Sequence, residues 1–418
     1  MTERPAYVPR RVAVTGMGCL SPVGNDVGSS WHALKAGRSG IAPITLFDAS
    51  DLPTRIAGEV KDFDPVSALG HKDARRTSRA IQLAMVAARE AVADSGIDIG
   101  PIAEAVAVII ASGVGGLDVL EKAVLANDRG GFKRVSAFTA TAMLVDMPAG
   151  MIATDTGARG PNFAIVSACA SGAHAIGEAA EQIRRGDAVA AIAGGTEGAL
   201  TSIGVASFCI IGALSRRNDE PERASRPFDR ERDGFVPAEG AAVMVLEDLD
   251  LALARGARIY AELVGYGATA DAGHVTQPEV AGTGARRCIE RALARAGCDA
   301  GDVGYVNAHG TGTPLNDVAE TRAWHAALGK HAESVPVSSS KSMTGHLMGA
   351  SGALEAVVAV MALYDGFAPP TINLDTPDPE CDLDYVPNVG RSIPVNLALT
   401  TSFGFGGHNA CLAFATPD

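Results

Sequence analysis

The stretch FAIVSACASGAH, Phe163–His174, changes character at a cysteine. Before Cys169 the residues are mostly apolar and partly β-branched, and after it comes a run of very small residues. This pattern predicts a buried strand that delivers the thiol to the first turn of a helix. The N–H groups of a helix N-terminus favour the nucleophilic thiolate and can also hold an oxyanion. The stretch therefore makes an acyl-transfer enzyme the first hypothesis.

Cys169 is one of seven cysteines, and most cysteines are small core residues. Two histidines distinguish it, because both stand in glycine-rich breaks that follow apolar runs. His309 lies in YVNAHGTGTP (305–314), and His346 ends VSSSKSMTGH (337–346). A histidine in a loop at the end of a strand is more often functional than one on a helix face. The three side chains are therefore candidate catalytic groups.

Two other residues with potentially reactive side chains are expected to have structural roles. His174 follows Cys169 by about one helical turn, so we expect it to be a packing residue. Cys411 lies in an alternating strand without a glycine-rich setting, and we expect it in the core.

Composition narrows the class of protein. A chain of 418 residues allows one large domain or two fused ones. The net charge of −13 argues against a nucleic-acid-binding protein. An odd number of cysteines without a Cys-x-x-Cys pair fits a reducing compartment and argues against a zinc site, so no metal is expected. The N-terminus lacks an apolar signal segment, and the most apolar run, Ala353–Tyr364, is too short to span a membrane. We expect a cytoplasmic enzyme.

One order of elements occurs twice along the chain. In the first part a helix with one apolar face ends at Gly96, and a strand follows at Val106–Ala111. In the second part a helix ends at Gly297, and a strand follows at Val303–Val306. Alternating strands and helices imply a parallel sheet, and the repeat implies two stacked α/β units.

We place the boundary between the units near Arg258, which divides the chain into 1–257 and 258–418. Cys169 belongs to the first half and both histidines to the second. The site is therefore expected between the halves, at strand ends.

The chain resembles the β-ketoacyl-acyl-carrier-protein synthases, the decarboxylating condensing enzymes of fatty-acid and polyketide synthesis. The resemblance implies the thiolase fold, an α/β architecture with five layers, α/β/α/β/α, built from two duplicated halves. The matching motifs run through nearly the whole chain: Gly16–Gly18, Ala168–Gly172, Ala193–Glu197, Ser225–Asp229, Arg232–Phe235, Asn307–Thr313, Lys341–His346, Pro369–Leu374 and Ser402–Gly407.

The resemblance also implies an acyltransferase reaction in two stages. An acyl chain moves from the 4'-phosphopantetheine arm of an acyl carrier protein to Cys169 as a thioester. A malonyl-carrier protein then loses CO₂, and its carbanion attacks that thioester. The backbone N–H groups of Cys169 and Phe405 would form the oxyanion hole. No cofactor is expected on the enzyme itself.

Other groups take supporting roles in this resemblance. His309 and His346 would stabilise the enolate that decarboxylation produces. Lys341 would be a fixed charge that orients this cluster, with Glu355 and Asp317 as its partners.

The resemblance assigns three further sets of residues around these groups. A gate at the cavity mouth would comprise Phe403, Gly404, Phe405, Gly406 and Gly407. The acyl pocket would be bordered by Val114, Phe138, Thr139 and Phe208, with Thr139 reaching across a dimer interface. Small basic clusters on this acidic chain would steer the acidic carrier protein to the enzyme: Lys72, Arg75, Arg76, Lys133 and Arg134, with Arg216 and Arg217 as a further cluster.

Departures from the fatty-acid enzymes bear on the pathway. Val114 and Thr139 are smaller or more polar than the residues common there, and Asn316–Thr321 looks more like polyketide ketosynthases. We therefore favour a type II polyketide ketosynthase subunit, and the alternative is housekeeping fatty-acid elongation by a synthase II.

Three other classes fit the residues less well. A chain-length factor would lack the nucleophile, a coenzyme A thiolase would need a second reactive cysteine, and an acyl-binding protein would need neither histidine. The expected partners are an acyl carrier protein and a second subunit, either a copy of this chain or a chain-length-factor homologue. We expect no binding to nucleic acid or to a membrane.

Overall fold

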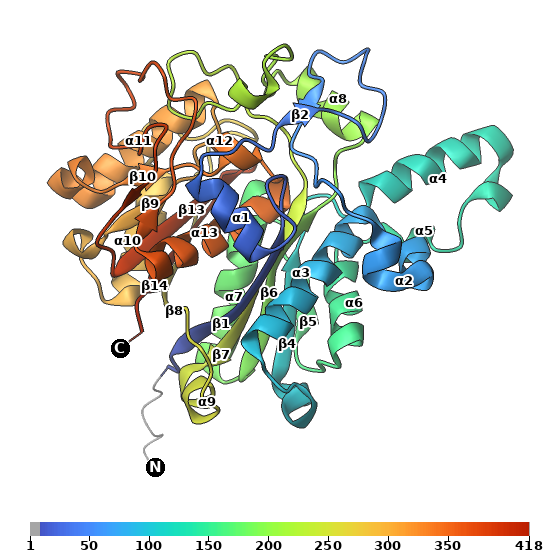
Figure 1. The fold of residues 1–418 in the computed structure, drawn as a ribbon, viewed down its shortest axis with the longest axis horizontal. Coiled ribbons are helices and arrows are strands. Elements are labelled where there is room, and N and C mark those ends of the chain that lie inside the picture. Colours follow the sequence, from blue (N-terminus) through green and yellow to red (C-terminus); the bar gives the residue numbers. More distant parts are fainter. Residues whose placement is uncertain (1–8, 418) are drawn as a thin grey trace.

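A computed structural model describes residues 9–417. Ten strands form one sheet in the order β10-β9-β13-β14-β8-β1-β7-β6-β4-β5 (Figure 1). Their bounds are β1 (Val12–Leu20), β4 (Val106–Ala111), β5 (Asn162–Phe163), β6 (Ala190–Glu197), β7 (Gly240–Asp248), β8 (Ala261–Ala270), β9 (Tyr305–Asn307), β10 (Val337–Ser338), β13 (Leu397–Gly404) and β14 (His408–Ala415).

The strands follow an equivalent order from the middle of the sheet toward each edge. From β1 outward the order is β7, β6, β4, β5, and from β8 outward it is β14, β13, β9, β10. In each run the first two pairings are antiparallel and the last two are parallel. The predicted duplication is therefore confirmed, but the sheet is mixed rather than parallel. The halves join where β1 pairs with β8 at Ala13↔Glu262 and Val14↔Ala261.

Helices form three layers around this sheet. The central layer is α7 (Ser171–Arg185) and α13 (Ser351–Asp365), which pack against each other between the halves. On the outside, α3 (Arg79–Ser95) and α6 (Met147–Thr156) cover the first half, while α10 (Thr283–Ala296) covers the second, with α11 (Pro314–Leu328) packed against α10. This arrangement gives the five layers that the resemblance implies.

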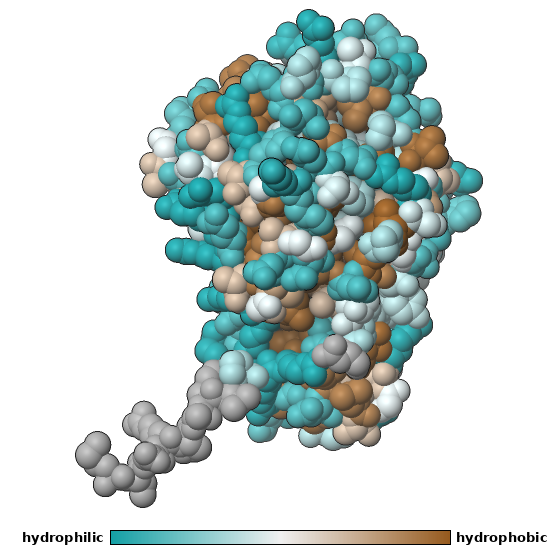
Figure 2. Space-filling view, turned by 90° about the vertical axis from the view of Figure 1, so that its left-hand side faces the viewer, coloured by the Kyte–Doolittle hydropathy of each residue, from teal (hydrophilic) through white to brown (hydrophobic). Residues whose placement is uncertain are grey.

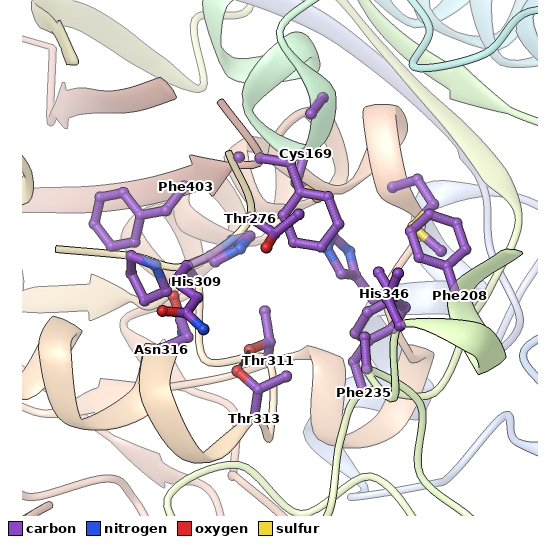
Figure 3. A pocket seen from close by; sticks show the side chains of 18 of the residues that line it. Cys169, Phe208, Phe235, Thr276, His309, Thr311, Thr313, Asn316, His346 and Phe403 are labelled. Atoms are coloured by element: carbon purple, nitrogen blue, oxygen red, sulfur yellow. Dashed lines mark hydrogen bonds between the residues drawn. The ribbon is translucent and has the colours of Figure 1, made fainter. Parts of the chain in front are cut away.

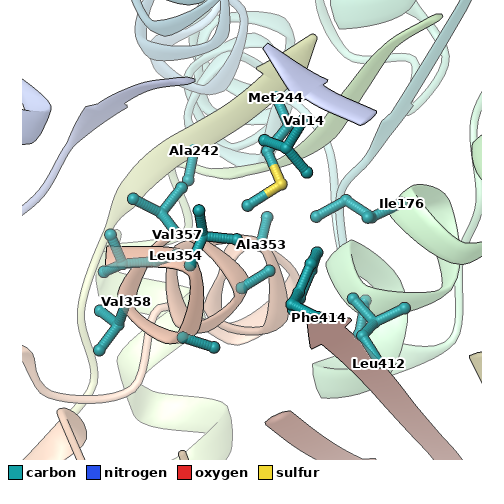
Figure 4. Packing of buried hydrophobic residues seen from close by; sticks show 14 of the residues in the cluster. Val14, Ile176, Ala242, Met244, Ala353, Leu354, Val357, Val358, Leu412 and Phe414 are labelled. Carbon is teal, nitrogen blue, oxygen red and sulfur yellow. The ribbon is translucent and has the colours of Figure 1, made fainter. Parts of the chain in front are cut away.

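Small and aliphatic side chains fill the central layer. Figure 4 shows Val357 of α13 and Ile176 of α7 among Met244 of β7 and Phe414 of β14. By length and composition the stretch Met348–Asp365 is a candidate membrane span within the described residues, but 83% of it is buried inside the structure. Burial to this extent is typical of a core helix in a globular protein.

The remaining helices and strands are short or lie at the periphery. They are α1 (Val27–Lys35), α2 (Pro65–Arg76), α4 (Leu117–Gly130), α5 (Thr139–Ala142), α8 (Ser202–Ile210), α9 (Leu249–Ala254), α12 (Lys341–Thr344), β2 (Ala42–Pro43), β3 (Ile56–Ala57), β11 (Phe367–Ala368) and β12 (Arg391–Ser392).

One edge of the sheet is exposed, which corrects a prediction. The strand before Cys169 is only Asn162–Phe163, and it lies at the end of the sheet rather than in its interior. Phe163 is 37% exposed and Val166 is 56% exposed. The helix α4 projects from the body of the molecule (Figure 1), and none of its residues is buried. The face in Figure 2, on the side of the second half, is instead mostly hydrophilic with small apolar patches.

Candidate active site

Cys169 lies in a tight turn that leads into α7. The turn is the 3₁₀ segment Ala168–Ala170, and α7 begins at the next residue. Ala168 has a φ of 50°, in the left-handed region that non-glycine residues seldom adopt. Ser171 holds this conformation, because its Oγ accepts from the Ser167 N–H at 2.8 Å and donates to the Ala168 carbonyl at 2.6 Å. The strained turn presents the thiol at the start of a helix.

His174, one turn further along α7, is half-buried. Its Nδ1 lies 2.6 Å from the Ser167 Oγ, and its ring packs edge-on against Tyr266. Burial lowers its pKa to about 4. Besides packing, His174 therefore braces the turn that carries Cys169. Cys411 is buried in β14 within the core of the second half, as predicted.

The surroundings of Cys169 favour the neutral thiol. Burial raises its pKa to about 12, and the charges of Glu197 and Glu355 also raise it. Lys341 and the backbone N–H of Phe405 lower the pKa, but their effects are smaller than that of burial. We expected the helix N-terminus to favour the thiolate, but burial outweighs the groups that do so.

The two histidines face one another across the cavity. Their ring centroids lie 5.4 Å apart with the planes at 86°, and Figure 3 shows both side chains beside Cys169. His309 follows β9, and His346 follows α12. Burial lowers the pKa of both imidazoles well below the ordinary value, and the charge of Lys341 lowers it further. Both rings are therefore neutral at physiological pH, and each carries one N–H.

Lys341 determines which nitrogen of His309 carries the proton. Its ammonium donates to the His309 carbonyl at 2.7 Å and to Glu355, and it lies 3.2 Å from His309 Nδ1. An ammonium has only donors, so Nδ1 accepts and the ring proton sits on Nε2. Burial raises the pKa of Glu355 to about 7, against the opposing effect of Lys341. On the other ring, Nδ1 of His346 lies 2.8 Å from the Ser351 Oγ.

Asp317 does not pair with Lys341, which corrects a further prediction. Its carboxylate lies 3.6 Å from the guanidinium of Arg232 and accepts from the N–H groups of Thr311 and Gly312. It thereby holds the glycine-rich loop that follows His309.

Glu320 has a similar function that we did not predict. It is buried, and it accepts from the N–H groups of His309 at 2.8 Å and Gly310 at 2.7 Å. The usual helix-start signal does not identify Glu320, because α11 begins at Pro314 and its acidic first-turn residue is Asp317, so Glu320 lies beyond the first turn.

The five gate residues form the end of β13 and the turn after it. A Cβ on Gly404 would lie 2.6 Å from the Ser167 carbonyl oxygen and 3.1 Å from the Cys169 nitrogen, so this strand passes directly beside Cys169. Gly406 and Gly407 have φ values of 89° and 74°, and the Gly406 N–H donates to the Val275 carbonyl at 2.7 Å. Phe403 packs against His309, and Phe405 lies near Phe208.

These groups surround one cavity of about 480 Å³. Cys169, His309 and His346 line it, as do Val114 and Phe208 of the predicted acyl pocket. Phe138 and Thr139 do not line it, because they lie at the start of α5, next to the projecting helix α4. Within a single chain these two residues do not border the cavity, and the expectation that Thr139 reaches the pocket across a dimer interface stays a prediction.

The predicted docking residues lie on two neighbouring segments. Lys72, Arg75 and Arg76 lie on α2, and Lys133 and Arg134 lie in the turn after α4; all five are exposed. Arg76 stacks over the Phe138 ring at 5.1 Å, which brings the two segments together. Within residues 9–417, no ion pair joins these five side chains to a carboxylate. Arg216 and Arg217 lie after α8, and Arg217 pairs with Glu231.

The described part of the chain contains no group of three or more His, Cys, Asp or Glu side chains placed to hold a metal ion.

The fold and the Cys–His–His cavity are those of a known enzyme class. The β-ketoacyl synthase N-terminal domain matches residues 9–252 and the corresponding C-terminal domain matches residues 260–375. The chain therefore belongs to the β-ketoacyl synthase family, whose members are acyltransferases that use substrates bound to an acyl carrier protein.

Named relatives favour one branch of this family. The chain is 51% identical over 407 residues to the 3-oxoacyl-[acyl-carrier-protein] synthase 2 of Synechocystis sp., covering 97% of this chain and 98% of the relative. The synthase 2 of Coxiella burnetii is 49% identical over 407 residues, with the same coverage.

Solved ketosynthase structures share the fold of this chain at a lower sequence identity. A ketosynthase bound to a hexaketide, in complex with its type II PKS acyl-carrier protein, superposes with a TM-score of 0.91 at 34% identity, covering 98% of this chain and 100% of that one. The ishigamide ketosynthase/chain length factor gives 0.92 at 36%, with the same coverage. The higher identity to the synthase 2 enzymes favours fatty-acid elongation over the polyketide role we favoured from the sequence.

Proposed function

We propose that this enzyme elongates acyl chains in fatty-acid synthesis, with Cys169 as nucleophile and His309 and His346 as the groups that promote decarboxylation. The convergence of these three side chains on one cavity supports the proposal most directly. The substrates are acyl and malonyl groups on the phosphopantetheine arm of an acyl carrier protein.

Loading begins when the acyl thioester enters the cavity. The Cys169 sulfur attacks the acyl carbonyl, and the oxyanion that forms lies against the N–H groups of Cys169 and Phe405. The carrier's C–S bond then breaks, and the proton of the Cys169 thiol ends on the departing phosphopantetheine thiol. Because the resting thiol is neutral, deprotonation must accompany attack or follow substrate binding.

Decarboxylation follows when malonyl-carrier protein replaces the free carrier. Breaking the C–CO₂ bond leaves negative charge on the thioester oxygen of the malonyl group. The Nε2–H of His309, set by Lys341, donates to that oxygen together with an N–H of His346. Neutral imidazoles suit this step, since they donate without first having to bind a proton.

Condensation completes the cycle. The carbanion attacks the carbonyl of the acyl-Cys169 thioester, so a C–C bond forms and the C–S bond to Cys169 breaks. The released thiolate takes up one proton. The gate residues Phe403–Gly407 lie where they would admit each substrate in turn, since this segment passes beside Cys169 and carries two glycines in the left-handed region.

We further propose how the enzyme meets its partners. The exposed basic surface of α2 and Lys133–Arg134 would receive the acidic carrier protein. A second copy of the chain would cover the edge strand β5, and would carry Phe138 and Thr139 toward the acyl pocket of its partner.

A reconstituted reaction tests the pathway. The wild-type enzyme and the Cys169→Ala variant are each mixed with an acyl carrier protein loaded with saturated or β-ketoacyl groups, and then with malonyl-carrier protein. We expect the wild type to acylate at Cys169 and to extend a saturated chain once, while Cys169→Ala remains folded but does neither. Mass spectrometry of the enzyme and the carrier reads both steps.

Two outcomes would contradict the proposal in different ways. Acylation that persists in Cys169→Ala would place the nucleophile elsewhere. Preferred extension of β-ketoacyl groups over saturated ones would favour the polyketide role.

A further inference from the structure

Glu197 is a buried carboxylate beside the reaction centre that the mechanism above does not use. It is the last residue of β6, it is fully buried, and it contributes to the wall of the cavity. An ionised carboxylate in such a place needs several hydrogen-bond donors, because burial otherwise strongly favours its neutral form. Burial does raise the pKa of Glu197, and hydrogen bonds oppose the rise.

Each carboxylate oxygen of Glu197 has two donors. Oε1 accepts from the Ser112 hydroxyl at 3.0 Å and from the Val114 N–H at 3.4 Å. Oε2 accepts from the Gly113 N–H at 2.8 Å and from the Gly349 N–H at 3.0 Å. All four donors are neutral, and three of them are backbone groups.

These donors come from the two functional regions of the site. Ser112–Val114 follows β4 in the first half, and Val114 lines the acyl pocket. Gly349 belongs to the second half, between His346 and the Ser351 that contacts its ring. One side chain therefore binds the wall of the acyl pocket and the turn of a decarboxylating histidine at the same time.

The two backbone segments touch at this point. A Cβ on Gly349 would lie 2.3 Å from the Gly113 nitrogen and 2.8 Å from Glu197 Oε2, and a Cβ on Gly113 would lie 2.7 Å from the same oxygen. Glycine at both positions lets the segments share one acceptor oxygen. A displacement of either segment would therefore move the Glu197 carboxylate and strain the hydrogen bond that it makes with the other segment.

We propose that Glu197 is a positioning residue that joins the acyl pocket to the His346 turn, so that chain-length selection and decarboxylation both depend on it. This inference rests on the proposed function. Glu197 has no acceptor site left for a substrate, since Ser112, Gly113, Val114 and Gly349 occupy both oxygens. Its charge raises the pKa of Cys169, but that effect is the same for every acyl chain and does not alter the chain-length ratio.

Substitution of Glu197 by glutamine separates its contact with the acyl pocket from its contact with the His346 turn. A glutamine oxygen at the Oε2 position can still accept from Gly113 and Gly349, and its NH₂ group then faces Ser112 and Val114. The Ser112 hydroxyl can turn to accept from that NH₂, but the Val114 N–H loses its acceptor. Glu197→Gln therefore keeps the join to the His346 turn and releases the pocket wall, whereas Glu197→Ala removes both.

The variants are compared by loading rate along a series of acyl-carrier proteins and by CO₂ release from malonyl-carrier protein. We expect Glu197→Gln to change the ratio of long-chain to short-chain loading by about threefold or more, with nearly normal CO₂ release. Glu197→Ala should in addition lower CO₂ release by about tenfold or more. The matched control is Glu247→Gln, a fully buried carboxylate of β7 that lies outside the cavity.

Hydrogen exchange gives a readout independent of activity. We expect Glu197→Ala to speed exchange in peptides that contain Gly113 and in those that contain Gly349, and Glu247→Gln to affect neither. Unchanged chain-length ratios in both Glu197 variants, with losses no larger than in Glu247→Gln, would overturn the proposal. If the alanine variant does not fold, the glutamine variant decides by its chain-length ratio. Failure of the proposed function would appear separately, as acylation in Cys169→Ala.

Discussion

At the scale of single residues, the roles proposed for His309 and His346 predict that loading and decarboxylation can be separated by mutation. Loading needs the sulfur and the oxyanion hole, whereas decarboxylation needs donors at the enolate oxygen. We therefore expect His309→Ala and His346→Ala to lower CO₂ release by about a hundredfold or more, and acylation of Cys169 by much less. Separate assays of loading and of CO₂ release test this. Normal decarboxylation in either variant would show that its histidine has another role.

At the same scale, we predict that Val114 influences the length of acyl chain that the enzyme accepts. Its side chain lines the cavity and is 47% exposed, so a larger residue would project into the space that the chain enters. We expect Val114→Phe to weaken loading of long chains by about tenfold while sparing short ones, since overpacking costs roughly 1–3 kcal/mol. A loading series on carriers of increasing chain length measures this. Equal loss at every length would place Val114 outside the acyl channel.

At the scale of elements, Glu90 connects helix α3 to the strand and helix that precede it. Its carboxylate accepts from the Cys19 N–H of β1 at 2.9 Å and from the Val27 N–H of α1 at 2.8 Å. Burial raises its pKa from 4.5 to about 7, despite these two hydrogen bonds. The folded state therefore binds this proton more tightly than the unfolded state, and the advantage is lost as the pH rises from about 4.5 to about 7.

Replacing Glu90 by glutamine should remove this pH dependence. We expect the free energy of unfolding of the wild type, relative to Glu90→Gln, to fall by about 1–3 kcal/mol over that pH range, allowing for screening at a half-buried side chain. Denaturant titrations of both proteins at several pH values give the difference. Parallel curves would show that Glu90 keeps its ordinary pKa.

At the scale of the whole molecule, the exposed edge strand predicts a dimer. Val166 beside β5 is 56% exposed, and Phe163 within β5 is 37% exposed. We expect Val166→Asp to weaken association by about tenfold or more, because it would bury an unpaired charge in the interface. Leu253→Asp is the control, since Leu253 is 59% exposed on α9, away from this edge. Sedimentation compares the two, and a fully active wild-type monomer would contradict the prediction.

Much of the architecture could be predicted from local patterns. The helices before Gly96 and Gly297 end where expected, and the strand Val106–Ala111 has the predicted bounds. The direction of β7 and β14 could not be predicted, because a buried strand has the same apolar pattern whichever way it runs. The exposure of Phe163 was missed for a related reason: apolar residues look alike whether their own chain or a second one covers them.

The candidate site was likewise predicted only in part from the sequence. Glycine-rich breaks after apolar runs pointed to Cys169, His309 and His346, and the structure brings all three to one cavity. The partner of Asp317 was missed because Arg232 lies in a loop distant in sequence. The neutral state of the thiol was also missed, since desolvation depends on how the whole chain closes around it.

The two-residue edge strand β5 also has a consequence for biogenesis. A newly made chain that folds alone presents unpaired main-chain groups and a bare aromatic ring at that edge, a template for any extended segment nearby. A short strand limits the risk, because it offers few groups for pairing. Refolding yield should therefore be highest at an intermediate protein concentration. At low concentration the edge strand stays uncovered, and at high concentration unfolded chains compete with the folded second copy for that edge. The rate of synthesis in the cell then becomes part of what determines how much active enzyme results.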